Sequence, residues 1–556
     1  MQRQFARCFS CSRIIFKGSI EVNSKTNANG SFWNAFKWFA IGGGAVVGSA
    51  YTMNQIYNGA RIDPSLKTST TSLKEISPPI YEDPQPLIEK LGEVLKNDQI
   101  SISNSEIASH SDSYWSTDHP NPSEKPFAII FPESTQDVSK ILQLAHQFNV
   151  PIVPYSGGTS LEGHYISTRN GICIDMSRMS TILKLHENDL DVVVQPCVDW
   201  QYLDDYLKSY NLLFGPDPGP GACIGGMVGT SCSGTNAGKY GTMRENVIAL
   251  TVVLADGTIV KTRQRPRKSS CGYNLTNLIV GSEGTLGIVT EITLKLWVRS
   301  KFERVAVVSF PHLSNAALAV QNIVKSGLLP NAMELLDKEM MKFVNNSGQV
   351  TSKYDELPTI MFKIGGQSEA ICNEMTLEVQ NICQENLGKF KLAKDEDEKD
   401  ELWTARKVAL WSTIDEGRKR YGQNVQVWTT DVAVPISKLV ESLQSTREEL
   451  DRNGVMASIV SHAADGNYHA LIVFPEEQRV KVTQIVKNMV HRALSMEGTA
   501  TGEHGVGIGK REFLQDELGP EAVNMMRKIK LALDPNLILN PDKVIKIDIN
   551  ENPRND

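Results

Sequence analysis

Two histidines seven positions apart could bind a metal ion together with one later carboxylate. His462 and His469 flank residues 463–468, whose Asp-Gly-Asn core is typical of a chain reversal between two strands. Such a reversal would bring both imidazoles to one end of a hairpin, where Glu503 could complete a two-histidine, one-carboxylate set with open positions. The mixed nitrogen and oxygen ligands suit zinc or manganese alike. On the residues alone, a packed or surface histidine pair is the more common alternative.

His504 directly follows Glu503 and is a candidate general base. An imidazole titrates near the operating pH, so it could take the proton of a substrate hydroxyl while the carbon-bound hydride leaves for an acceptor. The alternative is a structural histidine, or one that stacks on a ring-shaped cofactor.

Three glycine-rich segments predict a site for one large, phosphate-containing cofactor. The segment 215–241 holds nine glycines, three prolines and only two charged residues. Two shorter segments, 154–164 and 281–289, each follow a short apolar run. Because glycine costs backbone entropy, the expected compensation is close approach of bare N–H groups to a phosphate or a flavin-like ring.

Neither of the two common phosphate motifs fits these segments. Gly219-Pro-Gly221 lacks the helix start that a dinucleotide fingerprint requires, because proline stands at 216, 218 and 220. Gly234–Lys239 is one residue shorter than a P-loop, and Tyr240 stands where Ser or Thr is needed. NAD and ATP are therefore not expected as primary cofactors.

Alternating apolar runs predict the elements that position these residues. In the first part of the chain we expect helices at 135–148 and 200–210 and strands at 127–131, 150–153, 172–176, 192–195 and 291–297. After residue 300 a second α+β unit is expected, with helices near 314–325 and 370–385 and strands at 305–310, 359–364, 456–462 and 469–474. The acidic run 394–401 is expected to be the solvated start of a helix.

The chain as a whole resembles the flavoproteins of the vanillyl-alcohol-oxidase type. Five segments carry the resemblance in this order: YSGGTSLEGH at 155–164, DPGPGACIGGMVGTSCSGTNAGKYG at 217–241, VGSEGTLGIVTEITL at 280–294, SHAADGNYH at 461–469 and GTATGEHGVG at 498–507. It extends from about 127 to 544 and is strongest toward the D-2-hydroxyacid dehydrogenases, in particular the fungal mitochondrial D-lactate dehydrogenases that reduce cytochrome c. It implies an α+β fold with an FAD-binding domain at 84–299, a ferredoxin-like cap with the substrate site at 300–501, and a C-terminal segment at 502–556 that returns to the flavin.

The resemblance also implies which residues contact the cofactor. Thr159 stands where relatives with covalently attached flavin often have histidine, so FAD is expected to bind non-covalently. The implied contacts are Ser156, Gly157, Gly158, Thr159 and Ser160 around the pyrophosphate, and Pro218, Gly219, Gly226, Ser233, Asn236, Gly241 and Ile288 along the rest of the cofactor. With the family motifs, His462, His469 and Glu503 are expected to hold a divalent metal that grips the carboxylate and hydroxyl of a hydroxy acid.

Two positions of the cap bear on the substrate. Arg406 resembles the arginine with which family members bind the substrate carboxylate, and a guanidinium suits that planar group; an exposed helix arginine is the alternative. Relatives that act on 2-hydroxyglutarate have a lysine two residues before a cap aspartate, and Thr429 takes that place before Asp431. The missing cation favours oxidation of D-lactate to pyruvate over a D-2-hydroxyglutarate dehydrogenase. A flavin-binding protein without activity is the remaining alternative.

Charge and the N-terminus bear on location and partners. A formal net charge of −7 over 556 residues, with no basic patch interleaved with aromatics, gives no indication of nucleic-acid binding. Residues 1–30 hold five basic residues and one acidic residue, as in a mitochondrial presequence. The uncharged run 38–53 follows, and 31–54 is expected to anchor the protein in the inner membrane, ahead of a linker at 55–83. An extended presequence or a glycine-rich linker is the alternative. This topology would place the enzyme in the intermembrane space, with cytochrome c as electron acceptor.

Overall fold

The computed structural model describes residues 79–113 and 116–546. The expected presequence and anchor, and nearly all of the linker, lie outside these residues. The described residues belong to one compact unit. None of the helices in this part of the chain has the length and apolar character of a membrane span.

Residues 84–299, the part of the chain expected to be the first domain, begin with a sheet of four strands. Its order is β1 (Ile100–Ser101), β2 (Ala128–Ile130), β4 (Ile172–Asp175) and β3 (Ile152–Tyr155). β4 pairs in parallel with both β2 and β3, so β2, the helix after it and β3 form a β-α-β unit. The connecting helix α4 (Thr135–Gln147) begins at Ser134, whose side chain accepts the backbone N–H of Asp137. Two further helices of this part are α2 (Gln85–Val94) and α3 (Asn104–Ser109).

The second sheet of this domain is antiparallel, with the order β5 (Ile182–His186), β6 (Asp191–Val194), β10 (Ile288–Lys295), β8 (Val247–Val253) and β9 (Ile259–Lys261). The hairpin between β8 and β9 turns at Asp256 and Gly257, and Gly257 has a φ of 85°. Short elements complete the domain: α5 (Trp200–Lys208), α6 (Ile224–Thr230), α7 (Ala237–Tyr240), α8 (Met243–Asn246), α9 (Leu275–Ile279) and the pair β7 (Leu212–Leu213) and β11 (Trp297–Val298).

Residues 300–501, the part of the chain expected to be the cap, contain one large sheet whose first half is the expected ferredoxin-like unit. Its elements follow as strand, helix, strand, strand, helix and strand: β12 (Phe302–Ser309), α10 (Leu313–Lys325), β13 (Ala332–Leu336), β14 (Thr359–Gly366), α12 (Glu369–Glu385) and β15 (Lys389–Leu392). The strands pair antiparallel in the order β15-β12-β14-β13. An additional helix, α11 (Lys338–Asn346), lies between β13 and β14 in the chain.

The second half of the cap extends this sheet beyond β13. β18 (Ala457–His462) pairs with β13 and with β19 (Asn467–Phe474), and β19 pairs with β16 (Gln426–Thr429) and β17 (Val432–Ala433). Apolar side chains of α10, α12, α15 (Leu439–Arg452) and α16 (Arg479–Ser495) pack on one face of the sheet. Those of α11, α13 (Glu396–Lys407) and α14 (Ala409–Tyr421) pack on the other face. The acidic run expected to start a helix is the first turn of α13, capped by Asp395.

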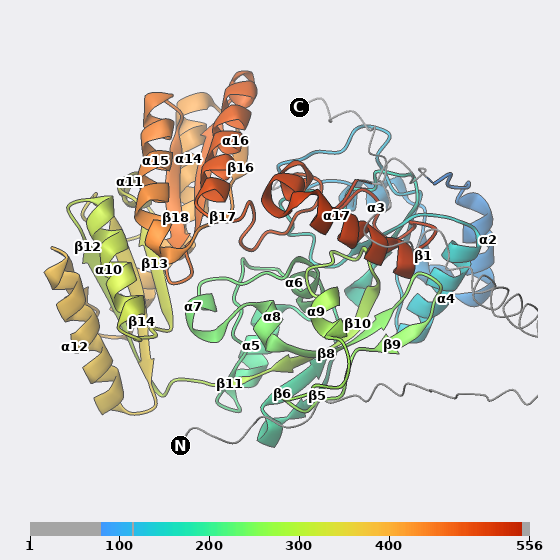
Figure 1. The fold of residues 1–556 in the computed structure, drawn as a ribbon, viewed down its shortest axis with the longest axis horizontal. Helices are drawn as coiled ribbons and strands as arrows, with labels where there is room; N and C mark the ends of the chain where they lie inside the picture. Colours follow the sequence, from blue (N-terminus) through green and yellow to red (C-terminus); the bar gives the residue numbers. More distant parts are fainter. Residues whose placement is uncertain (1–78, 114–115, 547–556) are drawn as a thin grey trace, which may run out of the picture. The chain divides into compact units, whose positions relative to one another are not determined.

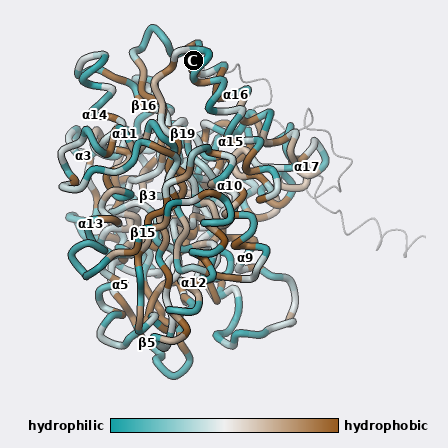
Figure 2. Tube along the Cα trace, turned by 90° about the vertical axis from the view of Figure 1, so that its left-hand side faces the viewer, coloured by the Kyte–Doolittle hydropathy of each residue, from teal (hydrophilic) through white to brown (hydrophobic). Residues whose placement is uncertain are grey.

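The C-terminal segment leaves the cap and packs on the first domain. Figure 1 shows α17 (Leu514–Leu533), in red, on the side of the first domain, and its residues Ile529 and Leu533 pack against a core of that domain. Leu539 forms a parallel bridge with Ile152 of β3. In Figure 2 the hydrophobic stretches run mainly through the interior, while the outer loops are largely hydrophilic. The loop at 502–507 therefore passes from the cap to the first domain and is held by both.

Candidate active site

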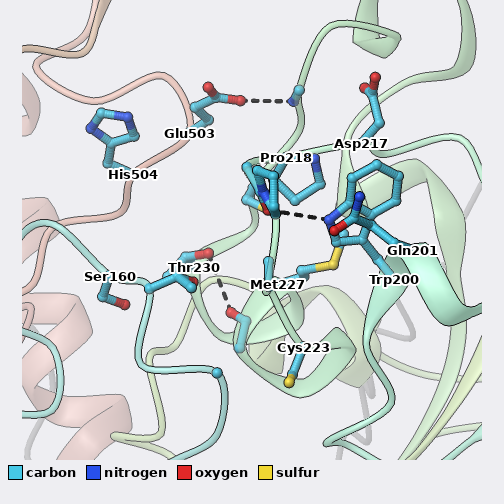
Figure 3. Close-up of a pocket in the computed structure, with 18 of the residues that line it drawn as sticks. Ser160, Trp200, Gln201, Asp217, Pro218, Cys223, Met227, Thr230, Glu503 and His504 are labelled. Atoms are coloured by element: carbon cyan, nitrogen blue, oxygen red, sulfur yellow. Dashed lines mark hydrogen bonds between the residues drawn. The ribbon is translucent and has the colours of Figure 1, made fainter. Parts of the chain in front are cut away.

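A cavity of about 1310 Å³ is bounded by the first domain, the cap and the loop at 502–507. Its wall includes residues of all three glycine-rich segments. Figure 3 shows Glu503 and His504 on one side of it, and Trp200 and Gln201 of α5 on the other. The volume exceeds the roughly 300–1,000 Å³ of typical small-molecule sites, so a large cofactor and a small substrate fit together.

Bare backbone forms much of the wall where two glycine-rich segments meet. A Cβ atom added to Gly157 would lie 2.6 Å from the backbone oxygen of Gly221, so no side chain fits there. Gly158 has a φ of 63°, which favours glycine. Every residue that sequence analysis expects at the cofactor lines the cavity, with the exception of Ser233 and Gly241. This wall has the form that an elongated cofactor with a pyrophosphate requires.

Ser233 and Gly241 lie outside the cavity wall, where Ser233 binds Glu503 and Gly241 ends a helix. The Ser233 hydroxyl and the backbone N–H of Gly234 both donate to Oε2 of Glu503 at 2.7 Å, so this segment holds Glu503 in place. Gly241 ends α7 with a φ of 79°, where a side chain would clash with Glu245.

His462, His469 and Glu503 converge as the sequence predicts. The two histidines lie on the antiparallel strands β18 and β19, and Glu503 comes from the loop at 502–507. Oε1 of Glu503 lies 3.0 Å from Nε2 of His462 and 3.3 Å from Nε2 of His469. One ligand atom of each residue lies within 4.8 Å of the others. This donor set has the spacing and the chemistry of a site for one divalent ion.

Hydrogen bonds on the far side of the rings orient these atoms. Nδ1 of His469 lies 2.8 Å from the backbone oxygen of Thr430, which can only accept, so Nδ1 carries the proton. Burial lowers the pKa of His469, and its Nε2 faces Oε1 of Glu503 at 3.3 Å. Nδ1 of His462 meets Oε1 of Glu334 at 2.8 Å, an outer-sphere carboxylate typical of metal-binding histidines.

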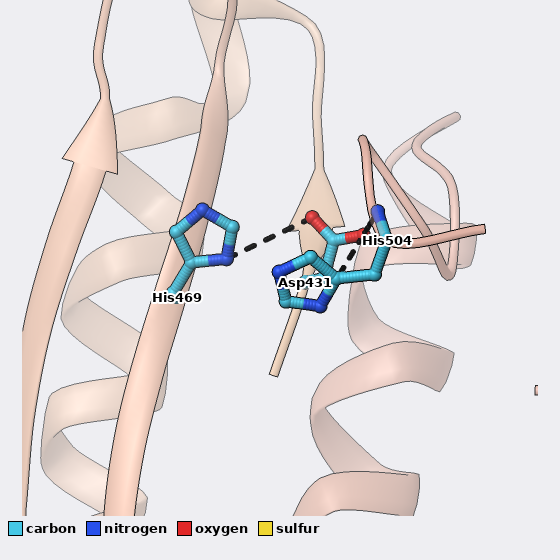
Figure 4. A group of neighbouring side chains, drawn as sticks. All are labelled: Asp431, His469 and His504. Atoms are coloured by element: carbon cyan, nitrogen blue, oxygen red, sulfur yellow. Dashed lines mark hydrogen bonds and ion pairs between the residues drawn. The ribbon is translucent and has the colours of Figure 1, made fainter. Parts of the chain in front are cut away.

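His504 lines the cavity next to this cluster and faces two buried carboxylates. Its ring stacks on that of His469, with centroids 5.0 Å apart and an interplanar angle of 11°. Nδ1 of His504 lies 3.7 Å from Oε1 of Glu162 and 3.9 Å from Oδ2 of Asp431. Figure 4 shows Asp431 between the two histidines. The imidazole is thus placed to accept a proton and to be stabilised by carboxylates once it is charged.

Asp431 holds the loop that carries Glu503 and His504, a role that sequence analysis missed. Its Oδ2 accepts the backbone N–H groups of Glu503 and His504 at 3.0 Å and 2.8 Å. Lys510 Nζ lies 3.3 Å from the same oxygen. Burial by itself would raise the pKa of Asp431, but the neighbouring His504 and Lys510 lower it well below its usual range. The carboxylate therefore remains an acceptor for the loop.

Arg406 lines the cavity and forms an ion pair with Glu334. Its Nε donates to Oε2 of Glu334 at 2.6 Å, and Glu334 is fully buried. Glu334 faces His462 directly across β13 and β18, so it links the arginine to the metal-binding candidates. Sequence analysis did not identify Glu334. Thr429, at the end of β16, also lines the cavity.

Comparisons with known proteins agree with the expected family. Two family models match the chain: the FAD binding domain at residues 126–263 and the C-terminal domain of FAD linked oxidases at residues 299–544. The chain is 51% identical over 523 residues to the mitochondrial D-lactate dehydrogenase [cytochrome] of Kluyveromyces lactis, covering 92% of this chain and 90% of the relative. It is 51% identical over 510 residues to the mitochondrial D-lactate dehydrogenase [cytochrome] 1 of Saccharomyces cerevisiae, covering 89% and 86%.

Solved structures confirm the predicted fold class. The 4-ethylphenol oxidase of Gulosibacter chungangensis, in its isoeugenol complex, aligns with a TM-score of 0.69 over 84% of this chain and 98% of its own, at 16% identity. The likeness at this low identity concerns the fold, which is that of the vanillyl-alcohol-oxidase type.

Proposed function

Because the chain belongs to the family of FAD-linked D-lactate dehydrogenases, a family of flavin-dependent oxidoreductases, we propose that it oxidises D-lactate to pyruvate in mitochondria and passes the electrons to cytochrome c. One observation supports this activity above all: the candidate base His504, the carboxylate-binding Arg406 and the metal-binding cluster line the same cavity as the glycine-rich segments. A protein that only bound flavin would not need a base, an arginine and a metal site in the same cavity.

FAD, when bound by the glycine-rich segments, supplies the acceptor for the hydride of C2. A divalent ion, when held by His462, His469 and Glu503, supplies a Lewis acid that lowers the pKa of a bound hydroxyl. The residue assignments fit both groups, since the backbone wall suits a pyrophosphate and the buried nitrogen and oxygen atoms suit zinc or manganese.

The side chains of the cavity bind the substrate carboxylate, accept its hydroxyl proton and limit its size. Arg406, fixed through Nε by Glu334, offers its terminal N–H groups to the C1 carboxylate of the substrate. His504 takes the proton of the C2 hydroxyl, and the carboxylates of Glu162 and Asp431 stabilise the imidazolium that results. Thr429 leaves its part of the wall without the cation that would suit 2-hydroxyglutarate, which favours the smaller monocarboxylate.

The flavin is expected to be released completely by acid precipitation of the protein. Thr159 lines the cavity at the position where relatives with covalent flavin often carry histidine, and threonine cannot form a histidyl bond. Absorbance of the supernatant and of the washed pellet measures the two fractions. Yellow colour that stays in the pellet would show a covalent link and would contradict this assignment.

Reduction of cytochrome c by D-lactate and the enzyme is expected to slow as ionic strength rises. The formal net charge is −7, and it falls to −11 when residues 1–30, which carry four net positive charges, are left out. An acidic protein and a basic carrier approach each other by electrostatic steering, which salt screens. The initial rate at 550 nm across a series of salt concentrations measures this dependence.

The same proposal places the enzyme on the intermembrane side of the inner membrane. Protease added to mitochondria with ruptured outer membranes should therefore digest it. Full protection until the inner membrane is lysed would place it in the matrix and would argue against cytochrome c as the direct acceptor.

A further inference from the structure

Polar side chains form a row across one face of the cap sheet. The register of β12, β14, β13, β18 and β19 places each member directly opposite the next one or on the adjacent diagonal. The row consists of Glu303, Lys363, Glu334, His462 and His469. Its members share a face with the apolar residues that pack beneath α11, α13 and α14. All of them line the cavity except Glu334, which lies fully buried beneath it.

Lys363 is a cation in this wall whose N–H groups remain available. Its Nζ lies 4.0 Å from the centroid of the Trp403 ring, and no described side chain forms a salt bridge or hydrogen bond with it. The neighbouring carboxylates are engaged elsewhere. Glu303 accepts the amide of Asn331 at 2.8 Å, and Glu334 binds both Arg406 and His462. Asp217 accepts the hydroxyl of Thr235 and the backbone N–H of Asn236. The aromatic face attracts the charge but accepts no conventional hydrogen bond, so three donors are left for a ligand.

The position of Lys363 relative to the metal-binding cluster defines what it could contact. β14 and β18 are separated by β13 alone, which puts their backbones roughly 10 Å apart. A lysine side chain and a four-carbon hydroxy acid together can span this distance. Arg406 pairs with Glu334, and Glu334 stands between Lys363 and His462 in the row.

We propose that Lys363 forms a subsite for a second carboxylate, so that the enzyme accepts short D-2-hydroxydicarboxylates such as D-malate in addition to D-lactate. This inference rests on the proposed function, in which Arg406 and the metal ligands take the C1 carboxylate and the C2 hydroxyl. Thr429 does not argue against it, because β16 lies on the other side of β19 from this row. Lys363 of β14 supplies a cation on the other side of His462 and His469 from position 429.

Lys363→Met tests the subsite, because methionine keeps the apolar stem against Trp403 and removes the charge. The flavin-loaded enzyme is mixed anaerobically with D-malate or D-lactate, and the rate of flavin bleaching gives the specificity constant for each acid. In Lys363→Met the ratio of the D-malate constant to the D-lactate constant is expected to fall about 10- to 100-fold, the worth of one charge-assisted hydrogen bond. Lys363→Arg should restore part of it. Lys407→Met is the matched control, since Lys407 is another cation of the cavity wall, and it should leave the ratio unchanged.

Each other outcome separates the subsite from the proposed function. A wild-type enzyme bleached by D-lactate but not by D-malate would overturn the subsite and leave the proposed function intact. An unchanged ratio in Lys363→Met, with both acids slowed equally, would assign Lys363 to the shared C1 carboxylate instead. If the ratio fell equally in Lys407→Met, the effect would come from the overall positive charge of the cavity wall. A specific contact between Lys363 and the second carboxylate would then be ruled out. Failure of the wild type with D-lactate would overturn the proposed function, and the subsite with it.

Discussion

Replacing His504 with alanine is expected to slow flavin reduction by D-lactate about 10²–10⁴-fold, the usual contribution of a positioned proton acceptor. The imidazole lines the cavity, stacks on His469 and has carboxylates behind it that would stabilise its charged form. Stopped-flow absorbance under anaerobic conditions follows the flavin directly and isolates this step from cytochrome c.

Two controls distinguish a proton acceptor from a structural histidine. His491→Ala removes an exposed ring that contacts the edge of Phe513 at 5.9 Å, outside the cavity, and should leave the rate unchanged. Added imidazole should restore part of the activity of His504→Ala, because a small base can occupy the vacated space. A near-normal rate in His504→Ala with full flavin content would assign His504 another role.

Replacing His462 or His469 with alanine is expected to abolish metal binding while the flavin remains bound. Both rings meet Oε1 of Glu503, whereas the cofactor wall is built from the glycine-rich segments of the first domain. The loss of a Lewis acid worth several kcal/mol should lower kcat/KM for D-lactate by about 10²-fold or more. Elemental analysis of the purified variants gives the metal content, and flavin absorbance gives the cofactor content.

His491→Ala serves again as the control and should retain both groups. The metal assignment would be wrong if both variants kept wild-type kinetics and the wild-type enzyme kept its activity after treatment with a chelator. If a variant lost flavin and metal together, the comparison would have to use Glu503→Gln, which keeps the size of the side chain that Ser233 and Gly234 hold.

The proximity of the two candidate metal-binding histidines could be predicted from sequence because they lie in a local pattern. His462 and His469 flank a short reversal between two apolar runs, which already indicates a hairpin, and the structure has β18 and β19 at those positions. The ferredoxin-like half of the cap also follows from the alternation of strand and helix patterns along the chain. These are short-range signals, in which residue spacing and backbone geometry are directly linked.

The supporting carboxylates could not be predicted in this way. Glu334 is 128 positions away from His462, and only the register of β13 against β18 brings the two together. The sequence indicates no role for Asp431 beyond its position near Thr429. Nothing local shows that its side chain accepts hydrogen bonds from backbone N–H groups of a loop more than 70 residues later. The same reason explains the hydrogen bond from Ser233 to Glu503, which no local pattern around Ser233 indicates. These supporting hydrogen bonds depend on which strands and loops the fold brings together, and the residue types alone do not reveal them.

Anaerobic titration of the flavin-loaded enzyme with the two enantiomers of lactate tests the proposed function most directly. We expect D-lactate to bleach the flavin absorbance completely and to yield one equivalent of pyruvate per flavin, while L-lactate leaves the spectrum unchanged over the same period. A flavin that stays oxidised in the presence of D-lactate, or that is reduced equally fast by L-lactate, would contradict the assignment of this cavity as the active site of a D-lactate dehydrogenase.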